Sequence, residues 1–583
     1  MKSKHFRFML RCCVLLFTFM ILSSGCTNSN TQNTKTLNQD FTSFTNQLFI
    51  QEVSSNSISL HYTLQNPSAY GIKNPPITFG SYNANTTLAL AGLENCHAAL
   101  QSFSYPSLSS KNQITYEILD DYLTTAINGA PYLLYDEPLS PITGIQAQLP
   151  VLLSEYQFHT TKDVDTYLSL LSDTPKYFDS LILFEQKKAD SGLFISDFTL
   201  NEIIKQCNAF ISLKTNNYLL STFEERVHSL DNITPAQQSV YTNLNQNLIE
   251  TSVIPAYQNL IDFLSSMLGI GKNENGLYYL PKGSDYYSYL VKRETGSSRS
   301  IDQLQALSYA QIERDLQSIE RILSTKEGKN ITASDTASYL TKTDPTAILT
   351  ELQKNLSANF PSLYDVDIHI KHVPKDMEPY LSPAFYMIPA IDHTSANVIY
   401  INQSQMGDSL ELYTTLAHEG YPGHLYQNTY FASKNPTPIR SILNYGGYLE
   451  GWATYAEMCS YYLSPLPKNH ATLLQKNASV MLGLYALADI GIHSNGWTLL
   501  ETTKFFNNYG VTDSNTIKKI FEYIVGDPSN YLKYYIGYLE FLELKKVAIK
   551  RWGNDFSQKR FHETVLDIGP APFDVIREQI SPN

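Results

Sequence analysis

The apolar residues of this chain recur mainly at the spacing of amphipathic helices, and this periodicity constrains the fold more than any other feature. From residue 40 to about residue 270, helical patterns are separated by short turns such as Asn66–Ser68 and Asn74–Pro76. Asp40 is an acceptable N-cap for the first of these helices. Hydrophobic residues make up 43% of the 583 residues, which is enough to bury a large core and excludes global disorder. The sequence therefore predicts a mainly α-helical protein.

One region departs from this spacing and predicts a small β-sheet just before residue 408. Val366, Ile368 and Ile370 alternate with polar residues, as in a strand that is buried on one face. Two further runs, Phe385–Ile388 and Val398–Ile401, are rich in residues that favour strands. We therefore expect a small sheet directly ahead of the helix that begins near residue 408.

A glycine-rich segment indicates where the helical chain divides. Gly269–Gly283 holds four of the glycines, and we place a seam there. The predicted parts are an N-terminal helical lobe, 40–270, and a C-terminal lobe, 285–583, which carries the small sheet and the motifs described below. The alternative is that 40–583 forms one domain.

The first 25 residues have the character of a bacterial signal peptide. Basic residues precede an apolar run, Cys12–Leu22, which is too short to span a bilayer comfortably as a permanent helix. The run ends in the sequence LSSGC, which resembles the lipobox of bacterial lipoproteins, although Ser23 stands where Leu is usual. In this interpretation Cys26 is lipidated and becomes the mature N-terminus. Ordinary secretion is the alternative.

The segment after Cys26 and the overall charge indicate where the protein works. Residues 26–39 are polar and low in complexity, which predicts a flexible tether. We expect the protein to lie at the extracytoplasmic face of the cell membrane, anchored by lipid on Cys26. The net charge of −13 argues against a surface that binds nucleic acid or anionic lipid. Cys96, Cys207 and Cys459 are widely spaced and are expected to be buried or idle thiols.

The most informative motif is HEGYPGH, residues 418–424, at the end of a helix whose start is marked by Asp408. The usual zinc-peptidase motif has two histidines four residues apart on one helical face. Here His418 and His424 are six apart, which an unbroken helix would separate by about 240°. Pro422 and Gly423 favour a break between them, so both imidazoles could still bind one metal. Glu419 could then take a proton from an activated water.

A second motif supplies a third ligand. In EGWATYAE, residues 450–457, Glu450 and Glu457 are seven apart and share one helical face. The residues between them look buried, and two buried carboxylates need cations nearby. We assign Glu450 as the third metal ligand and Glu457 as the group that orients a ligand histidine, while the opposite assignment stays open. The alternative for both motifs is structural, with a helix ended by a Pro-Gly turn and a solvated acidic stripe.

These two motifs together resemble the bacterial DUF885 family, whose members are often lipid-anchored. The resemblance continues in family order at residues 491–497 (GIHSNGW), 527–537 and 561–563, and it is clearest over residues 360–580. Leu425 departs from the family, which often has a second histidine there, so His424 is the candidate ligand at that point. The family is similar to helical zinc metallopeptidases that have an HExxH helix and a downstream glutamate ligand, which implies a large helical fold of that kind.

Supporting residues come from the same comparison. Amide hydrolysis builds an oxyanion that needs a hydrogen-bond donor besides the metal. Tyr534 matches the family position and is our first choice, in a helix that Asp527 would cap and Pro528 would begin. His493 is the second choice. Plain core packing is the alternative for Tyr534, and we expect packing roles for His562 and Cys459.

We therefore expect a surface-anchored, zinc-dependent hydrolase, and more narrowly a metallopeptidase that acts on peptides with Glu419 as general base. By analogy to zinc peptidases, the strand Val398–Ile401 would lie beside the motif helix and hold an extended substrate. One alternative is a lipoprotein that binds peptides or a metal without turnover. The other is a metal hydrolase of another amide or ester, such as a cell-wall fragment. The sequence has no phosphate-binding loop of the GxxxxGK[ST] type and no GxSxG nucleophile elbow.

Overall fold

The computed structural model describes residues 34–581, except 142, 357, 374, 376–377, 379–380 and 396. It confirms a mainly helical protein with one small sheet. The predicted signal peptide, 1–25, and Cys26 lie outside the described residues. Among the described residues, no helix combines the length and the apolar character that crossing a membrane requires.

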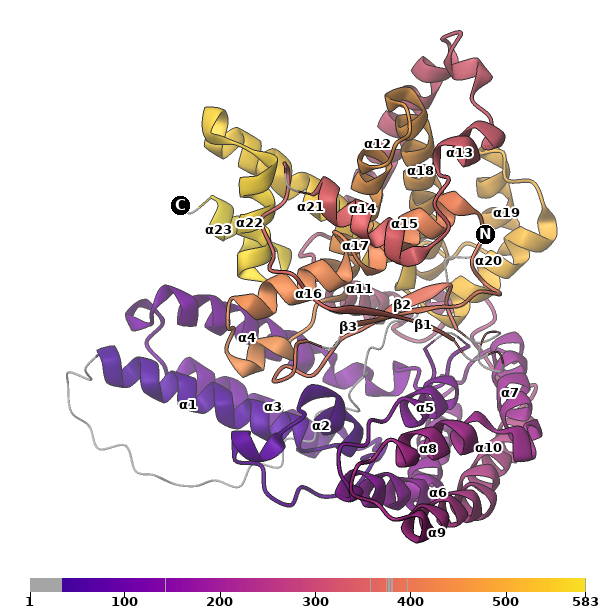
Figure 1. Ribbon diagram of the computed structural model, residues 1–583. Coiled ribbons are helices and arrows are strands. Elements are labelled where there is room, and N and C mark those ends of the chain that lie inside the picture. The colour runs from indigo at the N-terminus through magenta and orange to yellow at the C-terminus, as the bar shows by residue number, and fades with distance from the viewer. Residues whose placement is uncertain are drawn as a thin grey trace.

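Among the described residues, ten α-helices precede residue 270, and they carry the labels α1 to α10 in Figure 1. Their bounds are α1 (Thr34–Val53), α2 (Ser57–Thr63), α3 (Thr86–Gln101), α4 (Ser110–Gly129), α5 (Ile145–Ser154), α6 (Thr161–Asp190), α7 (Asp197–Ser212), α8 (Tyr218–His228), α9 (Pro235–Leu248) and α10 (Ile254–Ser266).

The remaining elements include the sheet and the helices around it. The strands are β1 (Ile368–His372), β2 (Ala384–Met387) and β3 (Asn397–Ile401). The helices are α11 (Gly283–Thr295), α12 (Ile301–Leu323), α13 (Ala333–Tyr339), α14 (Pro345–Asn355), α15 (Ser409–Glu419), α16 (His424–Ser433), α17 (Gly446–Leu463), α18 (Lys468–His493), α19 (Leu499–Asn508), α20 (Ser514–Gly526), α21 (Asn530–Trp552), α22 (Gln558–Ile568) and α23 (Phe573–Ile580).

The sheet has the order β1-β3-β2, so β3 is central and β2 is an edge strand. β1 pairs with β3 in parallel, and β2 pairs with β3 antiparallel. In Figure 1 the sheet crosses the middle of the molecule, with α15 to α18 above it and α5 to α10 below it. The small sheet predicted just before residue 408 is thus confirmed.

Alternate residues of the sheet belong to two different buried cores. The larger core includes Tyr386 and Ile399, together with most helices from α11 onward. The smaller core includes Phe385 and Tyr400, whose rings stack with centroids 4.8 Å apart, together with residues from α5 to α10. Since successive side chains of a strand point to opposite faces, β2 and β3 separate the two cores and contribute to both. This explains why these strands are apolar at every position except Asn397.

The two cores do not follow the predicted lobes 40–270 and 285–583. Helices α1, α3 and α4 pack in the larger core with the C-terminal helices, and the smaller core is built mainly from residues 139–267. Figure 1 shows α1, α3 and α4 beside one another, apart from the bundle of α5 to α10. The domain boundary itself stays a prediction.

The predicted tether, 26–39, is too long. Helix α1 begins at Thr34 rather than at Asp40. Leu37 is buried, and the side-chain oxygen of Asn38 accepts hydrogen bonds from Ser109 N and Asn112 Nδ2, both at 2.8 Å. The segment before Asp40 is therefore helical because it packs against the start of α4.

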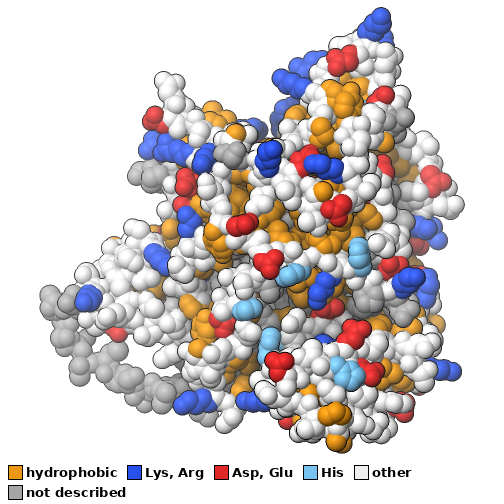
Figure 2. Space-filling view, in the orientation of Figure 1, with side chains coloured by type: hydrophobic (Ala, Val, Ile, Leu, Met, Phe, Trp, Pro, Cys, Tyr) orange, Lys and Arg blue, Asp and Glu red, His pale blue; other side chains and the backbone are white. Residues whose placement is uncertain are grey.

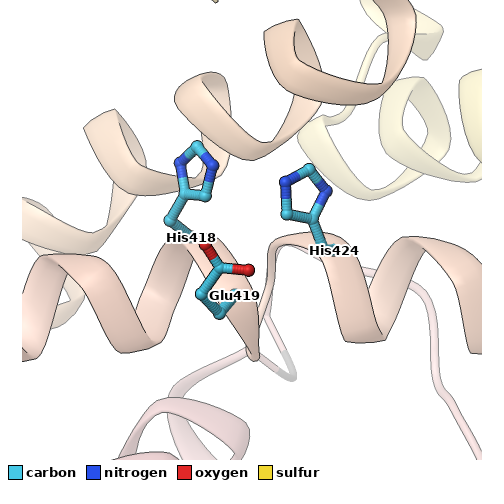
Figure 3. A group of neighbouring side chains, drawn as sticks. All are labelled: His418, Glu419 and His424. Carbon is cyan, nitrogen blue, oxygen red and sulfur yellow. The ribbon is translucent and has the colours of Figure 1, made fainter. Parts of the chain in front are cut away.

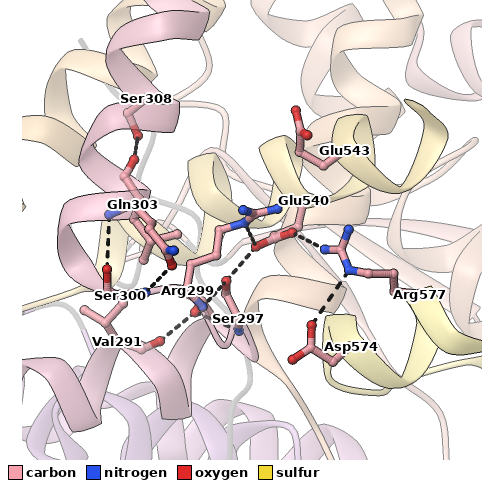
Figure 4. A network of polar contacts seen from close by, with 12 residues as sticks. Val291, Ser297, Arg299, Ser300, Gln303, Ser308, Glu540, Glu543, Asp574 and Arg577 are labelled. Atoms are coloured by element: carbon pink, nitrogen blue, oxygen red, sulfur yellow. Dashed lines mark hydrogen bonds and ion pairs between the residues drawn. The ribbon is translucent and has the colours of Figure 1, made fainter. Parts of the chain in front are cut away.

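A buried carboxylate ties α21 to two distant segments (Figure 4). Glu540 is 1% exposed, accepts a hydrogen bond from Ser297 Oγ at 2.6 Å and pairs with Arg299 at 2.8 Å. Its other oxygen lies 3.2 Å from Arg577 of α23. A buried carboxylate needs such cations, so this network fixes α21 against the start of α12 and against α23.

Candidate metal centre

The two motif histidines lie on either side of a tight bend between α15 and α16. The side chain of Asp408 caps α15 by accepting from two backbone N–H groups, as predicted, and α15 ends at Glu419. Gly423 N–H then donates to Ala417 O at 2.9 Å, which folds the chain back over the end of α15. A Cβ on Gly423 would lie 1.8 Å from His418 O, so only glycine fits there.

This bend brings His418, the penultimate residue of α15, to His424, the first residue of α16. Their ring centroids are 4.8 Å apart and the rings are nearly perpendicular, at 84°. Glu450 of α17 reaches both of them, because its Oε2 lies 3.5 Å from His418 Nε2 and 3.2 Å from His424 Nε2. His418 and Glu450 are buried. The six-residue spacing is thus compatible with a shared metal.

The donor set fits a zinc ion in chemistry, and the two separations that involve Glu450 fit in length. Two imidazole nitrogens and one carboxylate oxygen are ordinary zinc ligands, and tetrahedral ligands at 2.0–2.1 Å from an ion lie about 3.3 Å from one another. The two Nε2 to Oε2 separations, 3.5 and 3.2 Å, bracket that value. An ion would also offset the buried carboxylate of Glu450.

Glu419 lies beside the two histidines but is held differently. Figure 3 shows its carboxylate between the two rings and below them, and ligand atoms of the three residues all lie within 4.8 Å of one another. Its Oε2 accepts a hydrogen bond from Tyr386 N of β2 at 2.9 Å. Glu419 is 3% exposed. The carboxylate is therefore oriented toward the histidines by the backbone of the edge strand.

Glu457 contacts the opposite side of the His418 ring. Its Oε2 lies 3.1 Å from His418 Nδ1, while Nε2 of the same ring faces Glu450. Burial alone would lower the pKa of His418, but hydrogen bonds to Glu450 and Glu457 and the nearby Glu419 raise it to about 10. A ligand histidine is neutral, so a bound metal would displace this proton while Glu457 kept the ring in place.

Close contact between α17 and α21 positions Tyr534 at the centre. A Cβ on Gly451 would lie 2.3 Å from the carbonyl carbon of Gly537, and a Cβ on Gly537 would lie 2.2 Å from Gly447 O. These glycines let the two helix backbones touch. Tyr534, one turn before Gly537, is 9% exposed, and its ring centroid is 6.4 Å from that of His418.

Two sequence predictions near the centre are corrected. His493 is fully buried, but its Nδ1 accepts from Leu277 N at 3.1 Å and its Nε2 lies 2.9 Å from Ile524 O. Both nitrogens are thus occupied by backbone groups of other segments, and burial lowers the pKa of His493 to about 4. The ring joins three segments through these bonds, so neither nitrogen is free to serve as the predicted hydrogen-bond donor.

The second correction concerns the start of α21. Asp527 is the C-cap of α20 rather than an N-cap, and α21 begins at Asn530 after Ser529, whose φ is 65°. Pro528 lies in the turn between the helices. The predicted start at Pro528 was wrong because α21 begins two residues later, after a turn that connects it to α20.

His562 and the three cysteines were predicted to have packing roles or to be idle, and the structure shows their surroundings. His562 bonds to Asn359 O through Nδ1 at 2.7 Å and to the Tyr455 hydroxyl through Nε2 at 2.9 Å, as a packing role requires. Cys96 and Cys207 are free and buried, and Cys459 is free and half-buried.

The centre opens into a cavity of about 300 Å³ that Glu419 and His424 line. Ile388 and Pro389, which follow β2, line this cavity and also a second one of about 690 Å³. Val398–Ile401 belongs to β3, which is paired on both edges and so has no open edge for an extended substrate, whereas β2 is an edge strand and contacts Glu419 through Tyr386 N.

Two cavity residues were missed from the sequence. The backbone of Tyr386 contacts Glu419, and Arg440 lines the cavity from a short helical turn, η9 (Pro438–Ser441). Neither belongs to a motif with characteristic spacing. Only the strand pattern around Tyr386 could have suggested its position.

Solved structures show the same fold at low sequence identity. One is a candidate lipoprotein from Colwellia psychrerythraea, with a TM-score of 0.82 and 20% identity over 94% of this chain and 99% of that chain. Another is a candidate lipoprotein of unknown function from Shewanella oneidensis, with a TM-score of 0.61 and 16% identity over 94% and 99% of the two chains. Comparison with curated proteins gives no sequence match.

Family comparison covers most of the chain. Residues 83–580 match the family described as "Bacterial protein of unknown function (DUF885)". The match includes α15 to α17 and α21, which carry the histidines, the glutamates and Tyr534. The chain therefore belongs to the bacterial DUF885 family.

Proposed function

We propose that this protein is a zinc-dependent hydrolase that cleaves peptide bonds. The observation that carries the proposal is the convergence of His418, His424 and Glu450 at separations suited to one zinc ion, with Glu419 beside them in a cavity. A pair of histidines from two helices and a glutamate from a third would be costly to bury together without a cation.

The bound zinc would supply Lewis acidity, polarising the scissile carbonyl and lowering the pKa of water. The protein's own contribution is to hold the three ligands. Glu457 fixes the His418 ring through Nδ1, at 3.1 Å, so that Nε2 points to the centre. α17 carries Glu450 and Glu457 on one face, and its packing against α15 places both carboxylates beside the His418 ring.

Glu419 is placed to move protons. It neighbours both ligand histidines but has its own backbone partner, Tyr386 N, on Oε2. In the proposed reaction its carboxylate accepts a proton from the attacking water and later gives it to the leaving amine. The hydrogen bond from β2 keeps the carboxylate in one orientation, which such a transfer requires.

Two further groups would serve the substrate. Tyr534 approaches the ring of His418, and its hydroxyl would donate a hydrogen bond to the oxyanion. Beyond Tyr386, whose N–H is taken by Glu419, the outer edge of β2 continues into Ile388 and Pro389 along the cavity, where an extended peptide could pair with the chain.

The protein would work at a membrane surface. The lipobox-like end of the first 26 residues supports a lipid anchor on Cys26, and the two structural neighbours are described as candidate lipoproteins. The proposed location is the extracytoplasmic face of the cell membrane.

A peptide-library digest tests the proposed function. The zinc-loaded protein should cleave peptides, a chelator should abolish cleavage, and added zinc should restore it. Peptide binding without cleavage would instead favour a non-catalytic lipoprotein. Chelator-sensitive cleavage restricted to esters or cell-wall fragments would favour a hydrolase of another amide or ester.

A further inference from the structure

We propose that Arg440 binds a carboxylate of the substrate, so that the site selects peptides with a carboxylate near the scissile bond. The chief source of that group would be the free C-terminus, which would make the protein a carboxypeptidase. The inference rests on the proposed function for its catalytic meaning, but the binding itself can be tested separately.

Arg440 is an unusual residue because its charge is buried without an acidic partner. It is 5% exposed, and its Nη2 donates to Ile568 O at 2.7 Å and to Pro570 O at 3.0 Å. Within the part of the chain that the structure describes, it forms no ion pair, and its Nε has no hydrogen-bond partner.

A buried guanidinium of this kind is costly. Arginine is almost never fully buried unless it is paired, because desolvation penalises its charged form. Burial lowers the pKa of Arg440 to about 10, and among the described residues no carboxylate lies close enough to raise it again. Carbonyl groups and the Phe431 ring, 5.5 Å away, compensate only part of this cost. An anionic ligand would compensate the rest.

The position of Arg440 indicates what that anion belongs to. Arg440 lines the same cavity as Glu419 and His424, and among the described lining residues these three alone have ionisable groups other than tyrosine. The other polar walls are neutral amides and hydroxyls, including Asn428, Asn435 and Asn444. The cavity of about 300 Å³ suits the end of a chain rather than a long segment.

The guanidinium group of arginine is also well suited to bind a carboxylate. Because Nη2 donates to Ile568 O and Pro570 O, the charge-assisted hydrogen bonds to the carboxylate would come from Nη1 of Arg440. A carboxylate held by Arg440 would place a neighbouring peptide bond in the cavity that Glu419 lines. A side-chain carboxylate of Asp or Glu has the same chemistry, and the experiment separates the two sources.

The test measures binding to the Glu419→Gln chain loaded with zinc, so that no peptide is consumed. Calorimetry would compare acetyl-trialanine with its C-terminal amide. The free acid should bind about tenfold or more tightly, since a hydrogen bond to a charged group is worth about that factor. A third peptide, amidated at its end but carrying a glutamate side chain, shows whether a side-chain carboxylate is accepted too.

Arg440→Gln should bring the affinities of acid and amide to within about twofold, and Arg440→Lys should keep part of the preference. The matched control is Arg226→Gln, because Arg226 also donates to backbone carbonyls, including Leu153 O at 3.0 Å, but does not line this cavity. It should leave the preference intact. Thermal unfolding of each variant shows whether it is folded.

Equal binding of acid and amide to the Glu419→Gln chain would overturn the proposal. This comparison does not require any Arg440 variant. A folded Arg440→Gln chain that kept the preference would overturn it too, since Arg440 would then be a structural clamp only. If the preference depends on Arg440 while the wild-type protein cleaves no peptide, the carboxylate site stands and the hydrolase proposal fails.

Discussion

Among the glutamates of the candidate metal centre, Glu419 differs in its hydrogen-bond partner. Its Oε2 accepts from Tyr386 N at 2.9 Å, whereas Glu450 and Glu457 face histidine rings. Replacing Glu419 by Gln keeps the shape of the side chain and removes its basicity. Turnover should fall by about 10²- to 10⁴-fold while zinc content stays near that of the wild type.

This prediction is checked by steady-state kinetics together with metal analysis of the same preparation. A Glu419→Gln chain that cleaved peptides at the wild-type rate would show that Glu419 is not the base. A variant that lost zinc instead would show that this carboxylate is a ligand and that the division of roles is wrong.

Asp489 of α18 gives a pH-dependent prediction away from the centre. It accepts from the Tyr287 hydroxyl at 2.5 Å and from Ser529 N at 3.1 Å, and burial raises its pKa to about 8. The folded state therefore binds a proton here that the unfolded chain, with a carboxyl pKa of about 3.9, releases at lower pH. The stability that this proton contributes is present below about pH 4 and is lost as the pH rises toward 8.

The Asp489→Asn variant keeps an acceptor but cannot ionise. Between pH 5 and pH 7, the free energy of unfolding of the wild type should fall relative to this variant by up to about 1.4 kcal/mol per pH unit. Urea unfolding at several pH values measures the difference. Parallel curves for the two proteins would contradict the assignment.

Among the elements, the crossing of α17 and α21 controls the geometry of the centre. Gly451 and Gly537 touch through their backbones, and α17 carries both Glu450 and Glu457. In Gly451→Ala the new Cβ would lie 2.3 Å from the Gly537 carbonyl carbon, so the helices must separate. We expect a loss of about 1–3 kcal/mol of stability and a weaker affinity for zinc.

Gly526→Ala is the matched control, since its Cβ would meet only the side chain of Thr199, at 3.2 Å and beyond. Urea unfolding and zinc titration of both variants provide the measurement. If Gly451→Ala bound zinc and unfolded like the control, the helix crossing would not set the ligand positions.

The same elements show what the sequence could predict. The start of α15 at Asp408 and the break at Pro422 and Gly423 follow from local rules for caps and turns, and both were predicted. The roles of Tyr386 and Arg440 depend on segments far away in the chain, so no local spacing reveals them. His493 was misplaced for the same reason, because Leu277 and Ile524 occupy its two nitrogens.

At the level of the whole molecule, the sequence predicts the small sheet, but it does not predict that the sheet separates two buried cores. Its strands were recognised by composition, yet which core each side chain enters depends on the packing of helices that no periodicity describes. The placement of α1, α3 and α4 in the larger core was missed for that reason.

The proposed membrane anchor determines where the whole molecule is located. Replacing Cys26 by Ser removes the proposed lipid site, so the protein should move from the membrane fraction to the soluble fraction of the cell envelope. Fractionation and immunoblotting measure this. The multiple acyl chains of a bacterial lipoprotein are assumed, because one chain anchors only marginally. Unchanged membrane retention would contradict a lipid anchor at Cys26.

Zinc stoichiometry tests the central claim most directly. After purified protein is equilibrated with zinc and freed of excess, elemental analysis should find about one zinc per chain in the wild type. His418→Ala should lose it, while His97→Ala, at a half-buried histidine that pairs with Asp120 away from the centre, should keep it. Equal zinc content in the wild type and in a folded His418→Ala chain would contradict a metal centre built on His418, His424 and Glu450.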